Sequence, residues 1–425
     1  MAATWLDRTI GSPTLGTKFT WSAWVKKCFN GIYQHMATTT ANPGNWDSIR
    51  FDSSDRFEVT LANAAAVYVT TRVFRDDTSW YHFCVAVDTT LASGGDRIKI
   101  WVNGVEETAF DTETDASQDV VYNFQTSGKT YRIGANTWNT THERFDGLMT
   151  HVHWVDGTAY DASTFGSTDA TTGQWKINTN PTVTYGNNGF FLFKNDSALT
   201  DQSPNTNNFS LTSGTLTTNI DNPSNNFCTW NKLWNGAATF SYYRGNLDVS
   251  AEGSSWYATQ GTLGFNKGKY YWEFSDLGTE CQMGVADASI YQESSNPQDL
   301  TGTTCFYNNL GGEMRKDGVT TDNDYGTFGS TDIMGVAVDM DSNTISIYKN
   351  GSIIVTDYAL STSIKMAMPF IANYGTGNLV TTNFGGGVMN TTAVSSAGTN
   401  ASGNGTFEYD VPANHTALST KGMNL

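Results

Sequence analysis

The chain has little charge, and little basic charge in particular. Only 15% of its 425 residues are charged, against roughly 25% in an average soluble domain. Lysine and arginine number 24 against 41 aspartates and glutamates, which leaves a net charge of −17. Such a chain repels phosphate backbones and offers no basic patch to anionic lipid. We therefore expect no nucleic-acid partner and no attachment to a membrane surface.

Long apolar runs are missing too. No segment approaches the roughly 18 consecutive apolar residues of a membrane-spanning helix, so we expect no membrane insertion. The N-terminal residues, MAATWLDRTIGSPTLG, have neither the basic region nor the apolar stretch of a secretory signal peptide. The sequence therefore favours synthesis in a cytoplasm without signal-directed export.

Cysteine is scarce and unpatterned. The five cysteines form no CxxC pair, and Cys84 and Cys305 fall within the apolar runs HFCVAV and TTCFYN. We expect buried, unreactive thiols in a protein made in a reducing compartment. The abundant Asn, Thr, Ser and Gly, however, are typical of a protein that works outside a cell. Together these features indicate release by lysis, as for a virus particle.

The sequence does contain many short stretches in which apolar and polar residues alternate, and no long helical periodicity. Alternation with period two places one face of a strand in a core. Two such runs, IKIWVNGV at 98–105 and ISIYKNGS at 345–352, contain Asn-Gly near their ends. This pair accepts the positive φ angles of a type I′ hairpin turn. The sequence thus predicts an all-β protein.

The alternating runs form two blocks, which predict two β-sandwich (jelly-roll-like) domains in series. A stretch rich in Asn, Ser and Pro separates the blocks, and small residues follow the second. The weakly patterned residues 166–184 are expected to form a surface excursion, and Trp24, Tyr271 and Trp272 are expected in cores. The predicted boundaries are a first sandwich at 1–200, a linker at 201–228, a second sandwich at 229–388, and a flexible spacer with a C-terminal packing segment at 389–425.

Several motifs resemble those of known domain families. FTWSAWVK, WYHFCVAVD, IKIWVNG, YRIGA and FDGLMTHVHWVDG in the first block resemble, in order and spacing, a LamG-type (concanavalin A-like) domain. In the second block, GKYYWEF, MGVAD, MGVAVDMDSNTISIYKNG and PFIANYGTGNLVTTNFG resemble a SPRY (B30.2) domain. The joining pieces NPSNNFCTWNKL and FEYDVPANHTALST resemble those of LamG–SPRY virion-associated proteins of marine bacteriophages.

This resemblance implies a function, although both folds serve many roles. It implies a non-enzymatic bacteriophage virion surface protein, in a tail fibre or appendage or as capsid decoration. Its adhesion-type modules would bind cell-surface glycan or neighbouring virion proteins, in many copies or as a homo-oligomer. Two alternatives remain open: a carbohydrate-active enzyme or its carbohydrate-binding module, and a secreted bacterial adhesin.

The sequence contains no convincing catalytic motif. Glycosidases of the concanavalin A-like fold carry E-x-D-x-x-E, and the nearest match here is ETDASQ, with Glu113, Asp115 and Gln118. Glutamine cannot donate a proton as a general acid. No G-x-S-x-G nucleophile elbow and no phosphate-binding loop is present. We therefore expect no catalytic residue and no enzyme.

No cofactor is expected to be required, but calcium is a candidate because LamG domains often bind it at loop tips. Calcium takes six to eight oxygen ligands, which carboxylate-rich turns can supply. The carboxylates expected in one such loop are Asp111, Glu113, Asp115 and Asp119. The second acidic segment, DMDSN at 339–343, is expected to be an ordinary hairpin turn.

Zinc is a weaker candidate. His151 and His153 share a face of one predicted strand, and His142 and Glu143 precede them. Such a set could hold zinc in tetrahedral geometry. We favour instead two imidazoles on the outer face of a sandwich, against solvent or a neighbouring chain.

Predicted loops offer a binding surface. Sugars are bound by aromatic faces beside amide and carboxylate groups, and the loops NPGNW, NTWNTTHE, NDYGTF and NYGTGN supply that mixture. Contacts between subunits account for loop aromatics equally well. The residues predicted to contact glycan or a protein partner are Trp46, Trp138, Asn139, His142, Tyr325 and Tyr374.

Overall fold

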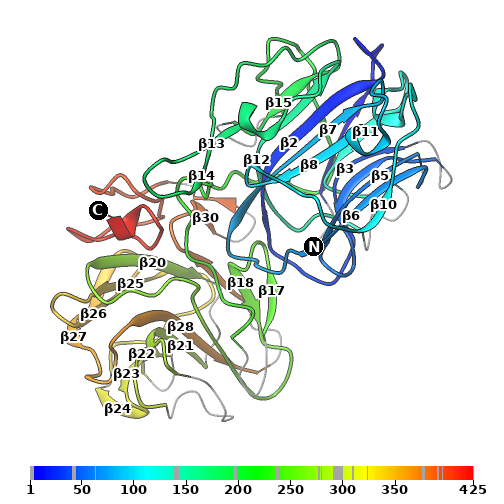
Figure 1. The fold of residues 1–425 in the computed structure, drawn as a ribbon. Coiled ribbons are helices and arrows are strands. Elements are labelled where there is room, and N and C mark those ends of the chain that lie inside the picture. The colour runs from blue at the N-terminus through cyan, green and yellow to red at the C-terminus, as the bar shows by residue number, and fades with distance from the viewer. Residues whose placement is uncertain are drawn as a thin grey trace. The chain divides into compact units, whose positions relative to one another are not determined.

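A computed structural model shows two compact units, described here one at a time (Figure 1). Unit 1 comprises Met1–Leu216 and Asn222–Ser224, and unit 2 comprises Thr217–Asp221 and Asn225–Leu425. The structure describes residues 4–40, 45–62, 64–137, 143–194, 199–234, 240–275, 278, 280–290, 300–308, 311–322, 324–375, 379–389, 392–394 and 396–424.

Within these residues the regular elements are β-strands and short 3-10 segments, which confirms the prediction of an all-β, two-sandwich protein. No helix in the described part of the chain combines the length and the apolar character needed to cross a membrane. The 3-10 segments are Gly94–Asp96, Asn123–Gln125, Ala162–Thr164 and Gly422–Asn424.

Unit 1 is built on two antiparallel sheets. The larger has the order β10 (Phe110–Thr114), β6 (Ala66–Val73), β5 (Arg56–Leu61), β4 (Ser48–Phe51), β3 (Gln34–Thr40), β11 (Thr130–Ile133), β1 (Trp5–Thr9) and β16 (Ser210–Ser213). The smaller has the order β15 (Phe190–Leu192), β12 (Gly147–Asp156), β2 (Lys18–Lys27), β7 (Trp80–Asp88), β8 (Ile98–Val102) and β9 (Val105–Glu106).

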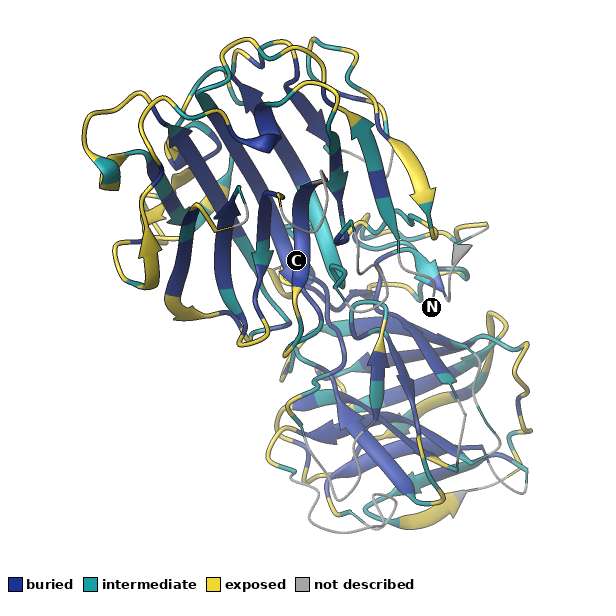
Figure 2. Ribbon diagram, turned by 90° about the vertical axis from the view of Figure 1, so that its right-hand side faces the viewer, coloured by how far each residue is buried: buried dark blue, intermediate teal, exposed yellow. Residues whose placement is uncertain are grey.

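Alternation along the strands places the core of unit 1 between these two sheets. Trp21 of β2 packs against Phe57 of β5, and Phe57 stacks on Phe83 of β7 with ring centroids 4.4 Å apart. A fully buried aromatic or aliphatic side chain of this kind contributes about 1.5–3 kcal/mol to stability. The strand centres are accordingly buried, and exposure concentrates in turns and on edge strands such as β10 (Figure 2).

A covering segment lies on the other face of the smaller sheet of unit 1. It comprises residues 157–189 and includes the hairpin of β13 (Gly166–Thr168) and β14 (Trp175–Ile177). Its Phe165 and Tyr185 form a second apolar cluster with Cys84 and Phe191. Residues 166–184 are mostly exposed, as expected of a surface excursion, whereas Phe165 and Tyr185 on either side of them bury a sheet face that the strand pattern leaves apolar.

Unit 2 repeats the two-sheet plan. One sheet has the order β17 (Ser241–Tyr243), β18 (Asp248–Ser250), β29 (Leu379–Asn383), β20 (Lys269–Ser275), β25 (Met334–Asp339), β26 (Thr344–Lys349) and β27 (Ser352–Ala359), and β32 (Thr416–Ala417) also pairs with β20. The other has the order β19 (Trp256–Gln260), β28 (Ala367–Tyr374), β21 (Cys281–Asp287), β22 (Thr303–Tyr307), β23 (Glu313–Lys316) and β24 (Val319–Asp322). A small hairpin joins β30 (Val388–Met389) and β31 (Thr392–Ala393).

Both Asn-Gly hairpins form as predicted. Asn103 and Gly104 turn β8 into β9 with φ angles of 49° and 78°, and Asn350 and Gly351 turn β26 into β27 with φ angles of 48° and 78°. Positive φ at both central residues is the type I′ geometry, which matches the twist of the flanking strands. The predicted core residues Trp24, Tyr271 and Trp272 are buried.

The predicted linker and spacer are more ordered than their composition suggests. Ser210–Ser213 pairs with β1, and Asn205 Nδ2 donates to the carbonyls of Gly186 and Gly189, so the first part of the predicted linker belongs to unit 1. In the predicted spacer, Gly398 N donates to Phe407 O at 3.0 Å. Asn, Ser and Gly here serve backbone pairing, which composition alone does not reveal.

All five cysteines are buried, and none of them forms a disulfide. Burial raises the pKa of the Cys305 thiol to about 12 and raises that of Cys84 well above its ordinary value. A thiol so protonated is a poor nucleophile and metal ligand. The predicted burial of the thiols is confirmed.

Candidate functional site

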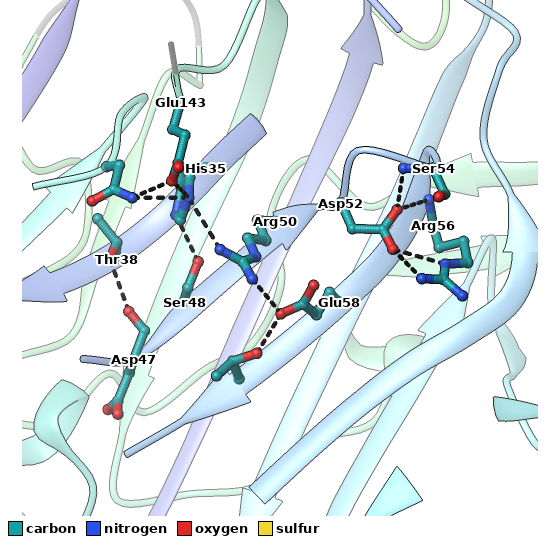
Figure 3. A network of polar contacts seen from close by, with 12 residues as sticks. His35, Thr38, Asp47, Ser48, Arg50, Asp52, Ser54, Arg56, Glu58 and Glu143 are labelled. Carbon is teal, nitrogen blue, oxygen red and sulfur yellow. Dashed lines mark hydrogen bonds and ion pairs between the residues drawn. The ribbon is translucent and has the colours of Figure 1, made fainter. Parts of the chain in front are cut away.

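The outer face of the larger sheet in unit 1 carries a continuous line of polar side chains. Ile49 of β4 and Phe57 of β5 point into the core, so alternation places Arg50 and Glu58 on the opposite face. The two are direct cross-strand partners, and Arg50 Nη2 donates to Glu58 Oε1 at 2.7 Å (Figure 3). A charge-assisted pair of this kind is held in fixed geometry.

His35 of β3 extends the line next to Arg50, its partner in register. Its Nδ1 lies 2.8 Å from Ser48 Oγ, and its Nε2 lies 3.5 Å from Arg50 Nη1 and 3.2 Å from Glu143 Oε2 (Figure 3). The ring is fully buried, and burial lowers the pKa of His35. The imidazole is therefore neutral near pH 7.

Asn136 connects His35 to a second ion pair. Its Nδ2 donates to the Glu143 carboxylate and lies 3.4 Å from His35 Nε2, and its backbone oxygen accepts from Arg132 Nη1 at 3.1 Å. Arg132 of β11 lies opposite Asp7 of β1 and binds it through two bonds, Nε to Oδ1 at 2.7 Å and Nη2 to Oδ2 at 2.8 Å. Because two hydrogen bonds join Arg132 and Asp7, this ion pair has the most fixed geometry of the line.

We call this line the polar row. It runs from β5 through β4, β3 and β11 to β1, which spans roughly 19 Å at the usual strand spacing. Its members are Glu58, Arg50, His35, Asn136, Arg132 and Asp7.

Aromatic rings accompany both cations of the polar row. The Arg50 guanidinium carbon lies 4.4 Å from the ring centroid of Tyr33 and 4.9 Å from that of Trp46. The Arg132 guanidinium carbon lies 5.0 Å from the ring centroid of Trp5. Cation–π attraction and ion pairing thus hold each guanidinium between a ring and a carboxylate. Of these rings Tyr33 is exposed, Trp5 is half-buried and Trp46 is buried. An exposed ring beside hydrogen-bonding groups is the chemistry that recognises sugars.

Of the residues predicted to contact glycan or a partner, the structure describes Trp46 in unit 1 and Tyr325 and Tyr374 in unit 2. Trp46 lies beside the polar row but is buried, with its ring centroid 6.4 Å from that of His35. In unit 2, Tyr374 ends β28 with its ring centroid 5.6 Å from that of Trp256, and Tyr325 packs half-buried against the core. The other predicted contacts lie outside the described residues: Trp138, Asn139 and His142.

Sequence reasoning missed most of the polar row. The signal for Arg50 and Glu58 was present, since SIRF and RFEVTL each place a charge opposite an apolar face. The sequence does not show the strand pairing that aligns Arg50 and Glu58 with Arg132 and Asp7. Strand order depends on contacts between residues that are far apart in the chain.

The predicted calcium ligands do not form a site. Asp111 and Glu113 lie on strand β10 and not in a loop, because this strand pairs with β6 at the edge of the sheet. Asp111 binds Arg56 at 2.5 Å, and Asp115 accepts from the Tyr68 hydroxyl at 2.7 Å. Asp119 lies in the turn beyond, where its φ angle is 55°. Nowhere in the part of the chain that the structure describes do three His, Cys, Asp or Glu side chains converge as a metal site.

The histidines expected on an outer face are buried. His151 sits at a bulge of β12, where its φ angle is 50°, and His153 Nδ1 lies 2.9 Å from the Tyr185 hydroxyl of the covering segment. Burial lowers the pKa of His151 to about 4 and that of His153 well below its usual value. The expected exposure of these rings is wrong, because His153 packs against Phe165 and Tyr185 of the covering segment and His151 packs against Phe191.

A buried Ser–His pair also lies under the covering segment. Ser22 Oγ is 2.8 Å from His82 Nε2, while the Trp175 indole N–H donates to His82 Nδ1 at 3.1 Å. Because Nδ1 accepts that hydrogen bond, the ring proton sits on Nε2 and is donated to Ser22. Burial also lowers the pKa of His82 to about 3. His82 therefore cannot take the Ser22 proton, and the pair is structural.

Comparison with known proteins identifies the two units separately. Residues 8–163 match the family model of the concanavalin A-like lectin/glucanases superfamily, and residues 269–387 match that of the SPRY domain. A search of curated proteins finds no match.

Among solved structures, the chain is similar to the SPRY domain of human HERC1, with 16% identity over 36% of this chain and 96% of that chain at a TM-score of 0.29. It is also similar to the TRIM65 PSpry domain, with 14% identity over 37% of this chain and 91% of that chain at a TM-score of 0.30. The chain thus combines a concanavalin A-like domain within residues 8–163 with a SPRY domain within residues 269–387.

Proposed function

We propose that this chain is a non-enzymatic surface protein of a bacteriophage virion that binds cell-surface glycan through the polar row. The single observation that carries the binding role is the row itself, in which aromatic rings lie beside fixed carboxylates on one sheet face. Binding at one site of this kind is weak. Many copies on one particle raise the overall affinity through high effective concentration.

The virion assignment is supported by the resemblance of the joining segments to those of marine bacteriophage LamG–SPRY proteins. The high Asn, Thr, Ser and Gly content and the net charge of −17 also fit a protein exposed on a particle. The non-enzymatic assignment is supported by the engagement of the row's carboxylates, since Glu58 is bound by Arg50 and Asp7 by Arg132. A carboxylate tied to arginine is poorly suited to donate a proton as general acid.

Two experiments test this proposal. Gold-labelled antibody against the recombinant chain should mark purified phage particles, at the tail for attachment or over the head for capsid decoration. Unlabelled particles would overturn the virion assignment. In parallel, the recombinant chain should bind bacterial polysaccharide without releasing reducing sugar, whereas release would make the chain a carbohydrate-active enzyme.

A further inference from the structure

The hairpin of the covering segment pairs with itself. Among the described residues, β13 and β14 form a two-stranded sheet of their own and join neither of the large sheets of unit 1. Gly157 and Gly186 lie near the two ends of the segment, with φ angles of 98° and 70° that glycine adopts without strain. The hairpin is therefore held on the sandwich mainly by side chains, and such a segment opens at lower cost than the sheets themselves.

Two histidines of the smaller sheet lie under this segment. His82 Nδ1 accepts from the Trp175 indole N–H at 3.1 Å, and the two rings stack with centroids 5.9 Å apart. His153 Nδ1 lies 2.9 Å from the Tyr185 hydroxyl, and its ring centroid lies 5.1 Å from that of Phe165. Both imidazoles are buried. The segment is thus fixed to the sheet through hydrogen bonds to two titratable rings.

A proton added to either ring opposes these contacts. His82 already donates from Nε2 to Ser22, so an added proton goes to Nδ1, to which the Trp175 N–H points. Two donors then face each other, and the hydrogen bond is lost. The Tyr185 hydroxyl can accept from a protonated His153, but the positive charge is then buried. Burial accordingly lowers the pKa of both histidines.

The surroundings do not compensate a positive charge on these rings. The other ionisable groups near them are His151, Lys194, Cys84, Tyr185, Asp161 and Asp201. After burial, repulsion from His151, His82 and Lys194 also lowers the pKa of His153. In the part of the chain that the structure describes, neither His82 nor His153 is hydrogen-bonded to a carboxylate. Protonation therefore favours an arrangement in which both rings meet water.

We propose that the covering segment is an acid-released cover, which leaves the smaller sheet of unit 1 when His82 and His153 take up protons. Once the segment is released, both imidazoles titrate near the ordinary histidine pKa of about 6.5. Between about pH 7 and about pH 5 each histidine then raises the ratio of open to closed chains about 25-fold, and the two together raise it about 600-fold. Release uncovers Cys84 and Phe191. It does not depend on glycan binding, because the polar row lies on the other sheet.

The Cys84 thiol reports the release, because it lies in the apolar cluster under the segment with its Sγ 3.9 Å from the carbonyl oxygen of Tyr160. The full chain is labelled between about pH 7 and about pH 5 with dithiodipyridine, a disulfide that also reacts with thiols in acid. Mass spectrometry of peptides gives the labelling rate at each cysteine, which is divided by that of a free cysteine peptide at the same pH. We expect the normalised rate at Cys84 to rise several hundredfold. Cys28, which is buried in the same unit but outside this cluster, should stay protected.

A variant ties the release to the histidines. His82→Gln keeps both hydrogen bonds with a side chain that does not titrate, so the rise at Cys84 should fall to about 25-fold. His35→Gln is the matched control, because His35 is equally buried but belongs to the larger sheet, and it should leave the rise unchanged.

Three results would overturn the inference. The first is a normalised rate at Cys84 that stays constant between about pH 7 and about pH 5. The second is equal acceleration at Cys84 and Cys28, which would show that unit 1 unfolds as a whole. The third is a His82→Gln chain that retains the full rise at Cys84 while Cys28 stays protected.

Discussion

Single glycines at the two Asn-Gly turns meet aromatic rings from distant segments. A Cβ on Gly104 would lie 2.4 Å from the Trp175 ring of the covering segment in unit 1. A Cβ on Gly351 would lie 2.7 Å from the Tyr409 ring in unit 2. Each turn thus requires glycine for two reasons, the positive φ angle and the close approach of a ring.

Alanine at either glycine should therefore cost more than backbone strain alone. We expect Gly104→Ala to lower the free energy of unfolding of unit 1 by about 2–4 kcal/mol, which combines left-handed strain with overpacking against Trp175. Gly128→Ala is the control, since Gly128 has φ +83° with nothing within 4 Å of a Cβ, and should cost about 1 kcal/mol. Denaturant unfolding measures both, and equal losses would show that the ring contact is unimportant.

At the scale of elements, a buried carboxylate anchors the C-terminal segment of unit 2. Glu273 of β20 accepts hydrogen bonds from the backbone N–H groups of Glu408 and Tyr409, each at 2.9 Å. The Tyr271 hydroxyl and Asn383 Nδ2 also donate to it, at 3.2 and 3.4 Å. Burial raises the pKa of Glu273 to about 7 despite these four donors.

This raised pKa makes the stability of unit 2 depend on pH. Between about pH 4.5, the ordinary pKa, and pH 7 the folded state holds a proton that the unfolded state has released. The protonated Glu273 therefore stabilises folded unit 2 by about 3 kcal/mol below about pH 4.5. This contribution is lost as the pH rises through 7. Glu273→Gln should flatten this dependence in denaturant unfolding.

The same variant should loosen the C-terminal segment, because the amide presents one acceptor oxygen to two backbone donors. Hydrogen exchange at the amides of Glu408 and Tyr409 should accelerate in Glu273→Gln, since their protection depends on Glu273. Glu252→Gln, at an exposed position of the same unit, is the control. Unchanged exchange at both amides would show that the segment is held by its other contacts.

The elements also show which features the sequence could predict. Strands β2, β7, β8 and β12, with the turn at Asn103–Gly104, follow from local alternation and turn chemistry. The sequence predicts a C-terminal packing segment but not the strand on which it packs, and it does not predict the contacts of the covering segment. Residues of both segments are small or polar and become ordered only against a sheet built from distant strands. The polar row lies between these cases: its charges were visible in the sequence, whereas their alignment was not.

At the scale of the whole molecule, buried titratable groups are distributed unequally between the units. In unit 1, burial lowers the pKa of His35, His151 and His153, and of His82 to about 3. Asp47 acts in the opposite direction on the pH dependence of unit 1, because burial raises its pKa to about 6. In unit 2 the pKa of His415 is lowered and that of Glu273 is raised, so the two shifts act in opposite directions.

Unit 1 should therefore lose stability on acidification, whereas unit 2 should gain stability through the protonation of Glu273. A histidine with a lowered folded pKa stabilises the fold above about pH 6.5, the unfolded value, and that contribution is lost as pH falls toward the folded pKa. Four such histidines, opposed by Asp47, should lower the free energy of unfolding of unit 1 as pH falls below about 6.5.

Hydrogen exchange under denaturant, followed in peptides of β2 and β7 for unit 1 and of β20 and β25 for unit 2, measures each unit separately. His82→Gln removes one of the four titrations and should reduce the acid loss of unit 1 by about 1 kcal/mol between about pH 6 and pH 5. Its neutral amide can still accept from Trp175 and donate to Ser22, as the imidazole does. An acid loss equal in both units would mean that exposed carboxylates, and not the four buried histidines of unit 1, set the pH response.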